Sequence, residues 1–407
     1  MAMKNSVLYC LLSLVLGLMS CQPGETPPNP TGTTLYFPPV SSTEWQTSTP
    51  ASLGWNETQL ADLNPFLQSK NTKAFIILKN GKIVVEKYFG TFTADSLWYW
   101  ASAGKTMTAM LVGIAQQEGL LNINSRSSTY LGRGWTSLPV LKEDLITVRH
   151  QLTMTTGLDD GVPDDDCTIP SCLIYKSDAG TRWAYHNAPY TLLDKVVETA
   201  TGRTYNAYYQ QKIRNAIGMN GGWLPNGFNN VLYSNARSMA RFGLLLLNKG
   251  KWDQTPVLTD SNYFNAQVNS SQAINPSYGY LTWLNGKSNF MAPIFQTVFP
   301  GMIVPNAPAD MYCALGKNDQ KVYVVIIPFG QNSTVAVIRG KSKIVTLADI
   351  SSGAFQTWVN SVFATPCPQN DAIRLAQEAA ARAAADAAAR AAADAAAKAA
   401  ADAAAKA

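Results

Sequence analysis

The stretch WASAGKTMTAM, from Trp100 to Met110, places Ser102 and Lys105 three residues apart where a helix is predicted to begin. Apolar residues then recur with a period of 3.6, which predicts a helix over residues 106–119. The spacing puts the serine and the lysine on one face, one turn apart. Free N–H groups at a helix start favour a developing alkoxide, and a lysine in a dry site can lose its proton and act as a base. An N-cap serine followed by a solvated lysine would have the same spacing, so the motif alone is not specific.

The composition indicates a globular protein with a large core. Of the 407 residues, 46% are hydrophobic and only 14% are charged, unlike a disordered chain. The formal net charge of +5 is spread along the sequence without a basic cluster. Nucleic acid is therefore not an expected partner.

The first 21 residues predict export. Lys4 precedes an apolar run over residues 7–19 that is too short to remain as a membrane-spanning helix. The run ends in Leu-Met-Ser-Cys21, which resembles a bacterial lipobox and predicts a lipid on Cys21. A plain secretory signal with a chance cysteine is the alternative. The expected localisation is that of an exported bacterial lipoprotein, facing the periplasm or the cell surface and held at the membrane by its lipid anchor only.

An exported chain lies where disulfides persist. Besides Cys10 and Cys21, the cysteines are Cys167, Cys172, Cys313 and Cys367. Cys167 and Cys172 are close enough in sequence to pair with each other, whereas the pairing of the other two stays open. The only histidines, His150 and His186, are not near a cysteine pair, so a zinc site is not expected. No cofactor and no other resident metal are predicted.

Changes in composition divide the chain. Residues 22–52 are rich in Pro, Thr, Gly and Ser and predict an extended tether, and residues 53–366 form the expected domain. Residues 367–407 end in an Ala-rich run with charges of alternating sign at every fourth position from Arg374. This pattern predicts a solvated single helix without an apolar face. The run resembles designed rigid linkers, and it is either an artificial extension or a natural spacer.

Strand signals lie at both ends of the expected domain. Residues 75–78 and 83–85 flank Asn80-Gly81, which predicts a hairpin with a type I′ turn. A second strand pair is predicted at residues 321–327 and 334–339, and helical patterns lie between, at 106–119 and 189–202. These signals predict an α+β fold, in which an antiparallel sheet is flanked by terminal helices and an all-helical region is inserted.

A second polar motif is Tyr185-His186-Asn187, just before a predicted helix. Asn187 could be an N-cap with Pro189 in the first turn, and Tyr185 a core aromatic residue. In an extended segment His186 would point away from its two neighbours, so a Ser-His-Asp triad is not expected.

An acidic segment precedes this motif, with Asp159, Asp160, Asp164, Asp165 and Asp166. Such a segment could hold a cation. A solvated rim beside the Cys167–Cys172 loop is the simpler prediction.

From about Leu53 to Phe363 the chain resembles the serine hydrolases related to class C β-lactamases. This family includes DD-peptidases, β-lactamases, esterases, amidases and transacylases, and the resemblance implies a β-lactamase/transpeptidase-like fold. The matching segments occur in the family's order: Ser102-Ala-Gly-Lys105, Gln151–Gly157, Gly180–Asn187, Ala236–Leu247 and Tyr278–Trp283.

The resemblance also implies roles for the motif residues. Ser102 would be the nucleophile, and Lys105 and Tyr185 would share the role of general base. Asn187 would bind the acyl side of the substrate or orient Lys105. The oxyanion hole would use the backbone N–H groups of Ser102 and Lys317.

The third motif of the family departs from its usual form. Ala314-Leu315-Gly316 lies where the family has Lys-Thr-Gly or a His-x-Gly relative. Ala314 cannot bind the carboxylate of an antibiotic or peptide, so an ester or a non-peptidoglycan amide is the expected substrate. A penicillin-binding DD-peptidase or a β-lactamase is the alternative, and a non-catalytic binding protein with the same fold is the alternative of another class. Acyl transfer would use the same residues, and the oligomeric state is left open.

Overall fold

The computed structural model describes residues 35–325, apart from 54, 56, 62, 70, 306, 308, 318 and 319, and the backbone of 334–340. All of these residues belong to one unit, Thr34–Phe363. The predicted anchor at Cys21, residues 22–34 of the tether, Cys367 and the Ala-rich tail lie outside the described residues.

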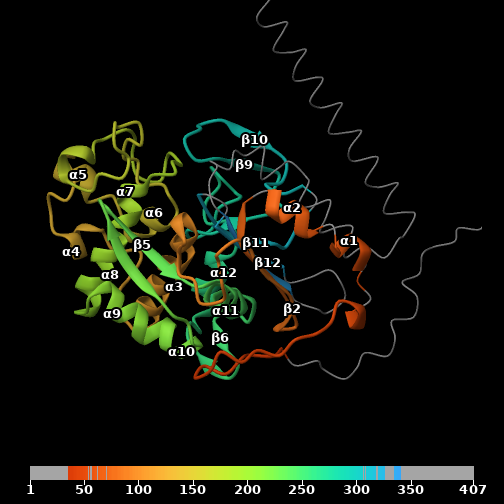
Figure 1. Cartoon of the computed structure of the whole chain (residues 1–407). Helices are drawn as coiled ribbons and strands as arrows, with labels where there is room; N and C mark the ends of the chain where they lie inside the picture. Colours follow the sequence, from red (N-terminus) through yellow and green to blue (C-terminus); the bar gives the residue numbers. More distant parts are fainter. Residues whose placement is uncertain are drawn as a thin grey trace, which may run out of the picture. The chain divides into compact units, whose positions relative to one another are not determined.

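The centre of the described chain is a six-stranded antiparallel sheet (Figure 1). In spatial order its strands are β2 (Lys82–Tyr88), β1 (Thr72–Lys79), β13 (Thr334–Gly340), β12 (Gln320–Val325), β11 (Tyr312–Gly316) and β8 (Trp283–Leu284). Strand β1 pairs with β13 along its whole length, with Phe75 opposite Ile338. The two ends of the domain therefore meet in one sheet, which confirms both predicted strand pairs and their antiparallel arrangement.

The turn between β1 and β2 confirms the hairpin signal. Asn80 and Gly81 have φ angles of 51° and 80°, as a type I′ turn requires at both central positions. A Cβ added to Gly81 would lie 1.8 Å from the carbonyl oxygen of Tyr36. Only glycine allows the preceding chain to approach so closely.

The predicted tether of residues 22–52 is too long. From Leu35 onward the chain already packs on the domain, and the Tyr36 N–H donates to the Asn80 carbonyl at 3.0 Å. The buried guanidinium of Arg241 donates to backbone carbonyls of Pro38, Pro39 and Ser42. This segment forms neither helix nor strand, so its carbonyls have no partners in regular structure, and the arginine supplies donors to them.

Helices surround this sheet. Before β1 lie η1 (Ala51–Leu53), α1 (Glu57–Ala61) and α2 (Leu63–Ser69). After β2 come β3 (Trp98–Tyr99), η2 (Ala101–Ala103), α3 (Gly104–Gln117), α4 (Ser128–Leu131), α5 (Val140–Glu143), α6 (Val148–Leu152), η3 (Pro170–Cys172), α7 (Asn187–Thr191), α8 (Leu193–Thr201), α9 (Tyr205–Tyr209), the π-helical turn η4 (Gln210–Arg214) and α10 (Asn215–Ile217). Then follow β4 (Gly222–Asn226), β5 (Asn229–Ser234), α11 (Ala236–Leu247), β6 (Lys251–Trp252), β7 (Thr255–Pro256), α12 (Ser261–Gln267), β9 (Asn289–Met291) and β10 (Val298–Pro300).

This order confirms the inserted helical region. Every named element between β3 and β4 is a helix, and α4 to α9 gather on one side of the view in Figure 1. Helix α11 packs on β1, β12 and β13 of the sheet. The predicted helix at 189–202 is present as α7 and α8 with a break at Leu192, and it ends at Gly202 with φ 66°. The C-terminal flanking helix falls outside the described residues.

Helix α3 lies in the middle of the core. Its residues from Gly104 to Ala115 are all buried, so it has no solvated face despite its amphipathic pattern. Gly113 is needed here, because an added Cβ would lie 2.4 Å from the ring of Tyr263. Across the described part of the chain, none of the helices combines the length and the apolar character needed to cross a bilayer.

Candidate active site

Ser102 lies in the 3₁₀ turn η2, immediately before α3. Ala101 has a φ of 47°, a left-handed conformation that is uncommon for a residue with a side chain. The N-cap of α3 is Ala103, and no side chain caps the helix. The alternative of Ser102 as an ordinary N-cap is therefore wrong, and its partly exposed hydroxyl is available for other contacts.

Lys105 is not a solvated lysine, because only 3% of it is exposed. Its Nζ donates to Ser102 Oγ at 3.1 Å and to Asn187 Oδ1 at 2.8 Å. Nζ also lies 4.1 Å from the centre of the Tyr190 ring. Burial lowers the pKa of Lys105 to about 7, although the negative charges of Asp166 and Asp165 oppose this shift. At neutral pH a large share of the molecules can therefore hold a neutral amine beside the serine hydroxyl.

Tyr185 approaches the same serine. A hydrogen bond to Ser102 lowers the pKa of Tyr185, but burial outweighs this effect and holds the pKa above its ordinary value. The ring of Tyr185 stacks on that of Trp283, with centroids 5.8 Å apart and planes at 18°. Trp283 belongs to β8, so the central sheet fixes the position of this phenol.

Asn187 is the first residue of α7 and does not cap it. Its Oδ1 accepts from Lys105, and its Nδ2 donates to Asp165 Oδ2 at 3.4 Å. The side chain therefore links the lysine to the acidic segment. The N-cap alternative for Asn187 is wrong.

The third-motif strand, β11, runs beside η2. A Cβ added to Gly316 would lie 2.4 Å from the Trp100 carbonyl oxygen and 2.8 Å from the Ala103 nitrogen. Gly316 thus permits a close approach that no other residue would allow. Because side chains alternate along a strand, Ala314 is on the same face as Gly316, while Leu315 points to the other. Ala314 is buried, and Lys317, which follows Gly316, is exposed.

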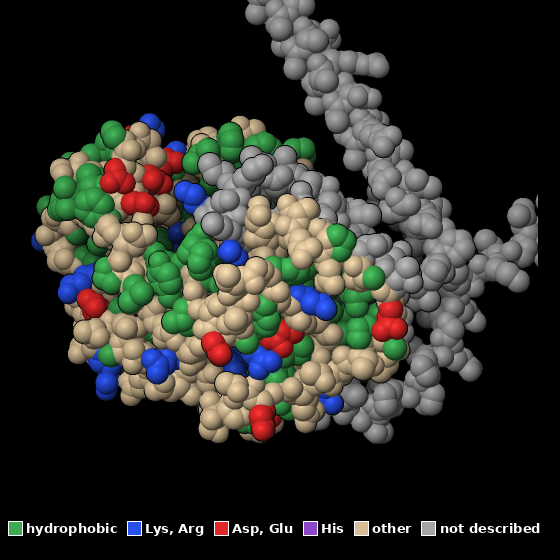
Figure 2. Space-filling model, in the orientation of Figure 1, with side chains coloured by type: hydrophobic (Ala, Val, Ile, Leu, Met, Phe, Trp, Pro, Cys, Tyr) green, Lys and Arg blue, Asp and Glu red, His purple; other side chains and the backbone are tan. Residues whose placement is uncertain are grey.

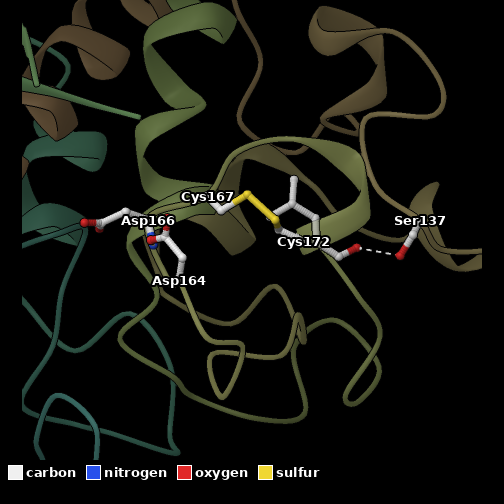
Figure 3. Close-up of a disulfide and its surroundings, with 6 residues drawn as sticks. Ser137, Asp164, Asp166, Cys167 and Cys172 are labelled. Carbon is white, nitrogen blue, oxygen red and sulfur yellow. Dashed lines mark hydrogen bonds between the residues drawn. A yellow bond between two sulfur atoms is a disulfide. The ribbon is translucent and has the colours of Figure 1, made fainter. Parts of the chain in front are cut away.

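The segment of residues 159–178, which we call the disulfide loop, carries the acidic residues. Cys167 and Cys172 form the predicted disulfide, with Cα atoms 6.0 Å apart, and Ser137 donates to the carbonyl of Leu173 at 3.1 Å (Figure 3). Cys313 is a buried free thiol in β11, and Cys367, the other cysteine whose pairing the sequence leaves open, is outside the described residues.

The acidic segment only partly fits the prediction of a solvated rim. Asp164 is exposed, but Asp165 and Asp166 are partly buried. The three residues bring carboxylate oxygens within 4.8 Å of one another, which raises the pKa of Asp165 in addition to the effect of its burial. Asp165 therefore faces the site through Asn187, and the sequence prediction missed this contact.

Neither histidine is placed to act in a triad. The ring of His150 accepts from the N–H of Thr147, the N-cap of α6, whose hydroxyl in turn accepts from the His150 N–H. His186 is buried, and its two ring nitrogens have no hydrogen-bond partner among the described residues. Burial lowers the pKa of His186 to about 4, so its ring is neutral at physiological pH.

A polar chain behind Lys105 was also missed by the sequence analysis. The hydroxyl of Tyr205 donates to Thr108 Oγ1 at 2.7 Å, and Thr108 Oγ1 lies 3.5 Å from the Tyr190 hydroxyl. Asp194 accepts from Asn230 at 2.9 Å, and burial raises its pKa to about 8. These contacts hold the Tyr190 ring that covers Lys105. The hydroxyl groups of this chain are up to 97 residues apart in the sequence, so no local pattern predicts them.

Comparisons with known proteins agree with this geometry. The sequence profile of the β-lactamase family matches residues 68–340. A penicillin-binding protein of Bacillus subtilis, PbpX, is 25% identical over 159 residues, which are 35% of this chain and only 39% of that relative.

Solved structures show the same fold. One is a protein from Bacteroides dorei described as a β-lactamase, with a TM-score of 0.59 and 16% identity, covering 76% of this chain and 99% of that one. Another is from Bacillus anthracis and is described as a 6-aminohexanoate-dimer hydrolase, with a TM-score of 0.59 and 17% identity, covering 81% of this chain and 89% of that one. The profile match spans most of the chain, and with this fold it shows that the chain belongs to the β-lactamase family, whose members are generally serine hydrolases.

Proposed function

We propose that this protein cleaves an ester or amide through a seryl acyl-enzyme formed on Ser102. The observation that carries the proposal is the contact of 3.1 Å between Ser102 Oγ and Lys105 Nζ, in which the lysine is buried and has a pKa of about 7. A nucleophile within hydrogen-bond reach of a base that titrates near neutral pH is the arrangement that acyl transfer requires.

The proposed reaction uses the groups around Ser102 in turn. Neutral Lys105 accepts the seryl proton while Oγ forms a bond to the carbonyl carbon of the substrate. The N–H groups of Ser102 and Lys317 stabilise the negative charge that develops on the carbonyl oxygen. Tyr185 donates its phenolic proton to the leaving group as the bond between that group and the carbonyl carbon breaks, and the proton held by Lys105 then passes to Tyr185, which restores the neutral amine and the phenol. Water then attacks the carbonyl carbon of the acyl-enzyme, with Tyr185 and Lys105 accepting the proton of the water and returning a proton to Ser102 Oγ as the acid product leaves.

The third-motif strand supports an uncharged substrate. Ala314 is buried on the face of β11 that meets η2, and it offers no cation for a carboxylate. The names of the similar proteins point to different substrates, one to penicillin binding and one to a linear amide, so they leave the choice open. We therefore place esters and non-peptidoglycan amides first, and a DD-peptidase or β-lactamase activity second.

Labelling with a fluorophosphonate probe tests the mechanism. The probe should modify one residue, Ser102, and Ser102→Ala should abolish the labelling. A panel of short esters and a chromogenic cephalosporin then ranks the substrate classes. Labelling that survives Ser102→Ala contradicts the mechanism, and a folded wild-type protein that is not labelled at all favours the non-catalytic binding protein.

We also propose that the protein is exported and anchored by a lipid on Cys21. The apolar run over residues 7–19 supports export, and so does the Cys167–Cys172 disulfide, since such bonds persist in oxidising compartments. Palmitate labelling of the expressed full chain should depend on Cys21. If Cys21→Ala is labelled and retained at the membrane like the parent, the anchor lies elsewhere.

A further inference from the structure

The β9–β10 hairpin, residues 289–300, ends in an exposed apolar tip. Ile294, Phe295 and Val298 are 83%, 46% and 53% exposed. Figure 2 shows hydrophobic side chains gathered at the top of the molecule, where Figure 1 places this hairpin. Grouped apolar side chains at a protein surface commonly mark a binding site.

The base of this hairpin is fixed to the wall of the candidate active site. Asn275 exchanges two hydrogen bonds with the backbone of Met291, and Ser277 donates to the Asn289 carbonyl at 2.8 Å. The next residue, Tyr278, packs edge-on against the Tyr185 ring at 6.2 Å. The hairpin and the phenol beside Ser102 therefore share one support.

The tip touches the same wall. Gln296 Nε2 donates to the carbonyl of Trp183 at 3.3 Å, and the Trp183 ring lies 6.3 Å from that of Tyr185. The tip of the hairpin is thus held by Trp183, and its base by the residue before Tyr278, and the rings of Trp183 and Tyr278 both pack near Tyr185. In the proposed reaction, this is the residue that protonates the leaving group.

Ile294 keeps its side chain in water at a conformational cost. Its φ is 64°, which is a genuine outlier for a β-branched residue. Strain of this kind persists where the surrounding structure enforces it, and it is concentrated at ligand-binding sites. The strain supports a binding role for the tip but does not by itself identify a ligand.

We infer that the tip of the β9–β10 hairpin, residues 294–298, binds an alkyl chain on the leaving-group side of the substrate. This inference rests on the proposed function, since the leaving group is defined by the acyl-enzyme mechanism. An apolar chain fits a site whose third-motif strand offers Ala314 in place of a cation and whose nearby tip presents Ile294, Phe295 and Val298. Burying these side chains against an alkyl chain removes apolar surface from water on both partners.

Alkyl acetates from methyl to octyl test the inference, with acid release followed in a pH-stat. The kcat/KM of the wild type should rise by roughly fourfold for each methylene that is buried at the tip. Ile294→Ser with Phe295→Ser should lower the rates with a loss that grows with chain length. Leu141→Ser, which removes an equally exposed apolar side chain from α5, is the matched control and should keep the wild-type profile.

Two further measurements, with p-nitrophenyl esters and with octan-1-ol, distinguish a failure of this inference from a failure of the proposed function. If the alkyl acetates are hydrolysed through Ser102 but the tip variant keeps the wild-type slope, the inference is overturned and the proposed function stands. A tip effect confined to p-nitrophenyl esters of increasing acyl length also overturns it, because the chain would then bind on the acyl side.

Ligand-observed NMR follows the binding of octan-1-ol to the Ser102→Ala variant, with and without the tip substitutions Ile294→Ser and Phe295→Ser. This measurement needs no turnover. If no ester is hydrolysed but octan-1-ol binds in a tip-dependent way, the apolar site is real and the proposed function is wrong. If neither occurs, both are overturned.

Discussion

The disulfide loop and the β9–β10 hairpin both reach the candidate active site, but with opposite chemistry. The loop is polar and cross-linked, since Arg182 pairs with Asp160 at 2.6 Å and the disulfide closes its centre. The hairpin is held by hydrogen bonds from side chains to its backbone and presents an apolar tip.

The two segments also contact different residues of the site. The loop touches Asn187 through Asp165, and the charge of Asp165 acts on Lys105. The hairpin instead contacts Asn275, Ser277 and the carbonyl of Trp183, on the aromatic side of the site around Tyr185. The protonation state of the base and the binding of an apolar chain should therefore be separable, and changes in the loop should alter pH profiles while changes in the tip alter chain-length preference.

The largest expected effect comes from replacing Lys105, because without the base neither the charge of the loop nor the apolar tip of the hairpin can affect turnover. Lys105→Arg keeps a positive charge but cannot release a proton at working pH. The value of kcat/KM should fall by about 10²–10⁴-fold for every ester, whatever its chain length. The variant must first be shown to melt like the parent. If the variant is then active, Lys105 is not the base, and the charge of Asp165 in the loop does not influence catalysis through Lys105.

Gly316→Ala should be the next most severe change. The new Cβ would lie 2.4 Å from the Trp100 carbonyl, so β11 must move away from η2 and carry the Lys317 N–H with it. Loss of one oxyanion donor typically costs about 10²–10³-fold in kcat. Neither the pH profile nor the chain-length preference should change, because neither the loop nor the hairpin is altered.

Lys317→Ala is the control for that prediction. It removes the side chain but keeps the N–H, so its loss of activity should be much smaller than that of Gly316→Ala. Equal losses would show that the Lys317 side chain, and not the backbone, serves the reaction.

Local sequence signals predicted the structural features that are set by residues close together in the sequence. Asn80-Gly81 predicted the hairpin turn, and WASAGKTMTAM predicted both α3 and the meeting of Ser102 with Lys105. Strand signals at both ends of the domain, with helical patterns between them, predicted the inserted helical region. These features follow from periodicity, turn chemistry and side-chain direction within one element.

Contacts between distant segments could not be predicted in this way. A run of Asp predicts solvation, yet Asp165 reaches Asn187 because the disulfide loop folds back over α7. The Pro-rich N-terminal segment predicts a tether, but Arg241, about two hundred residues later, supplies its hydrogen bonds. The positive φ of Ala101 runs against the preference of alanine, so the sequence pattern predicts the start of a helix where Ser102 lies in a 3₁₀ turn.

Removing the disulfide tests whether the cross-link keeps the loop in place. Cys167→Ser with Cys172→Ser should reduce the free energy of unfolding by about 2 kcal/mol, the chain-entropy value for so short a loop. Thermal melting and denaturant titration measure this loss. Chain-length preference should be unchanged, because the hairpin is held by Asn275, Ser277 and Trp183 and not by the disulfide. If the preference also changes, the two segments are coupled and the comparison fails.

The smallest expected effect, and the most specific one, comes from Asp165. Its negative charge favours the ammonium form of Lys105 and so raises the pKa of Lys105 against the effect of burial. Asp165→Asn removes that charge and keeps a similar shape. The pKa of Lys105 should then fall below about 7, and the amine should stay neutral at lower pH.

This change has a definite sign in the pH profile. Since kcat/KM reports the free enzyme, the acidic limb of its profile should move to lower pH in Asp165→Asn, while the rate well above neutrality changes little. Asp164→Asn is the matched control, because it makes the same charge change in the same loop at an exposed residue that does not face Lys105. The tip variant should also leave this limb in place. A limb that moves equally in the two Asp variants would show only a general effect of net charge, and a limb that moves to higher pH would mean that the titrating group is not Lys105.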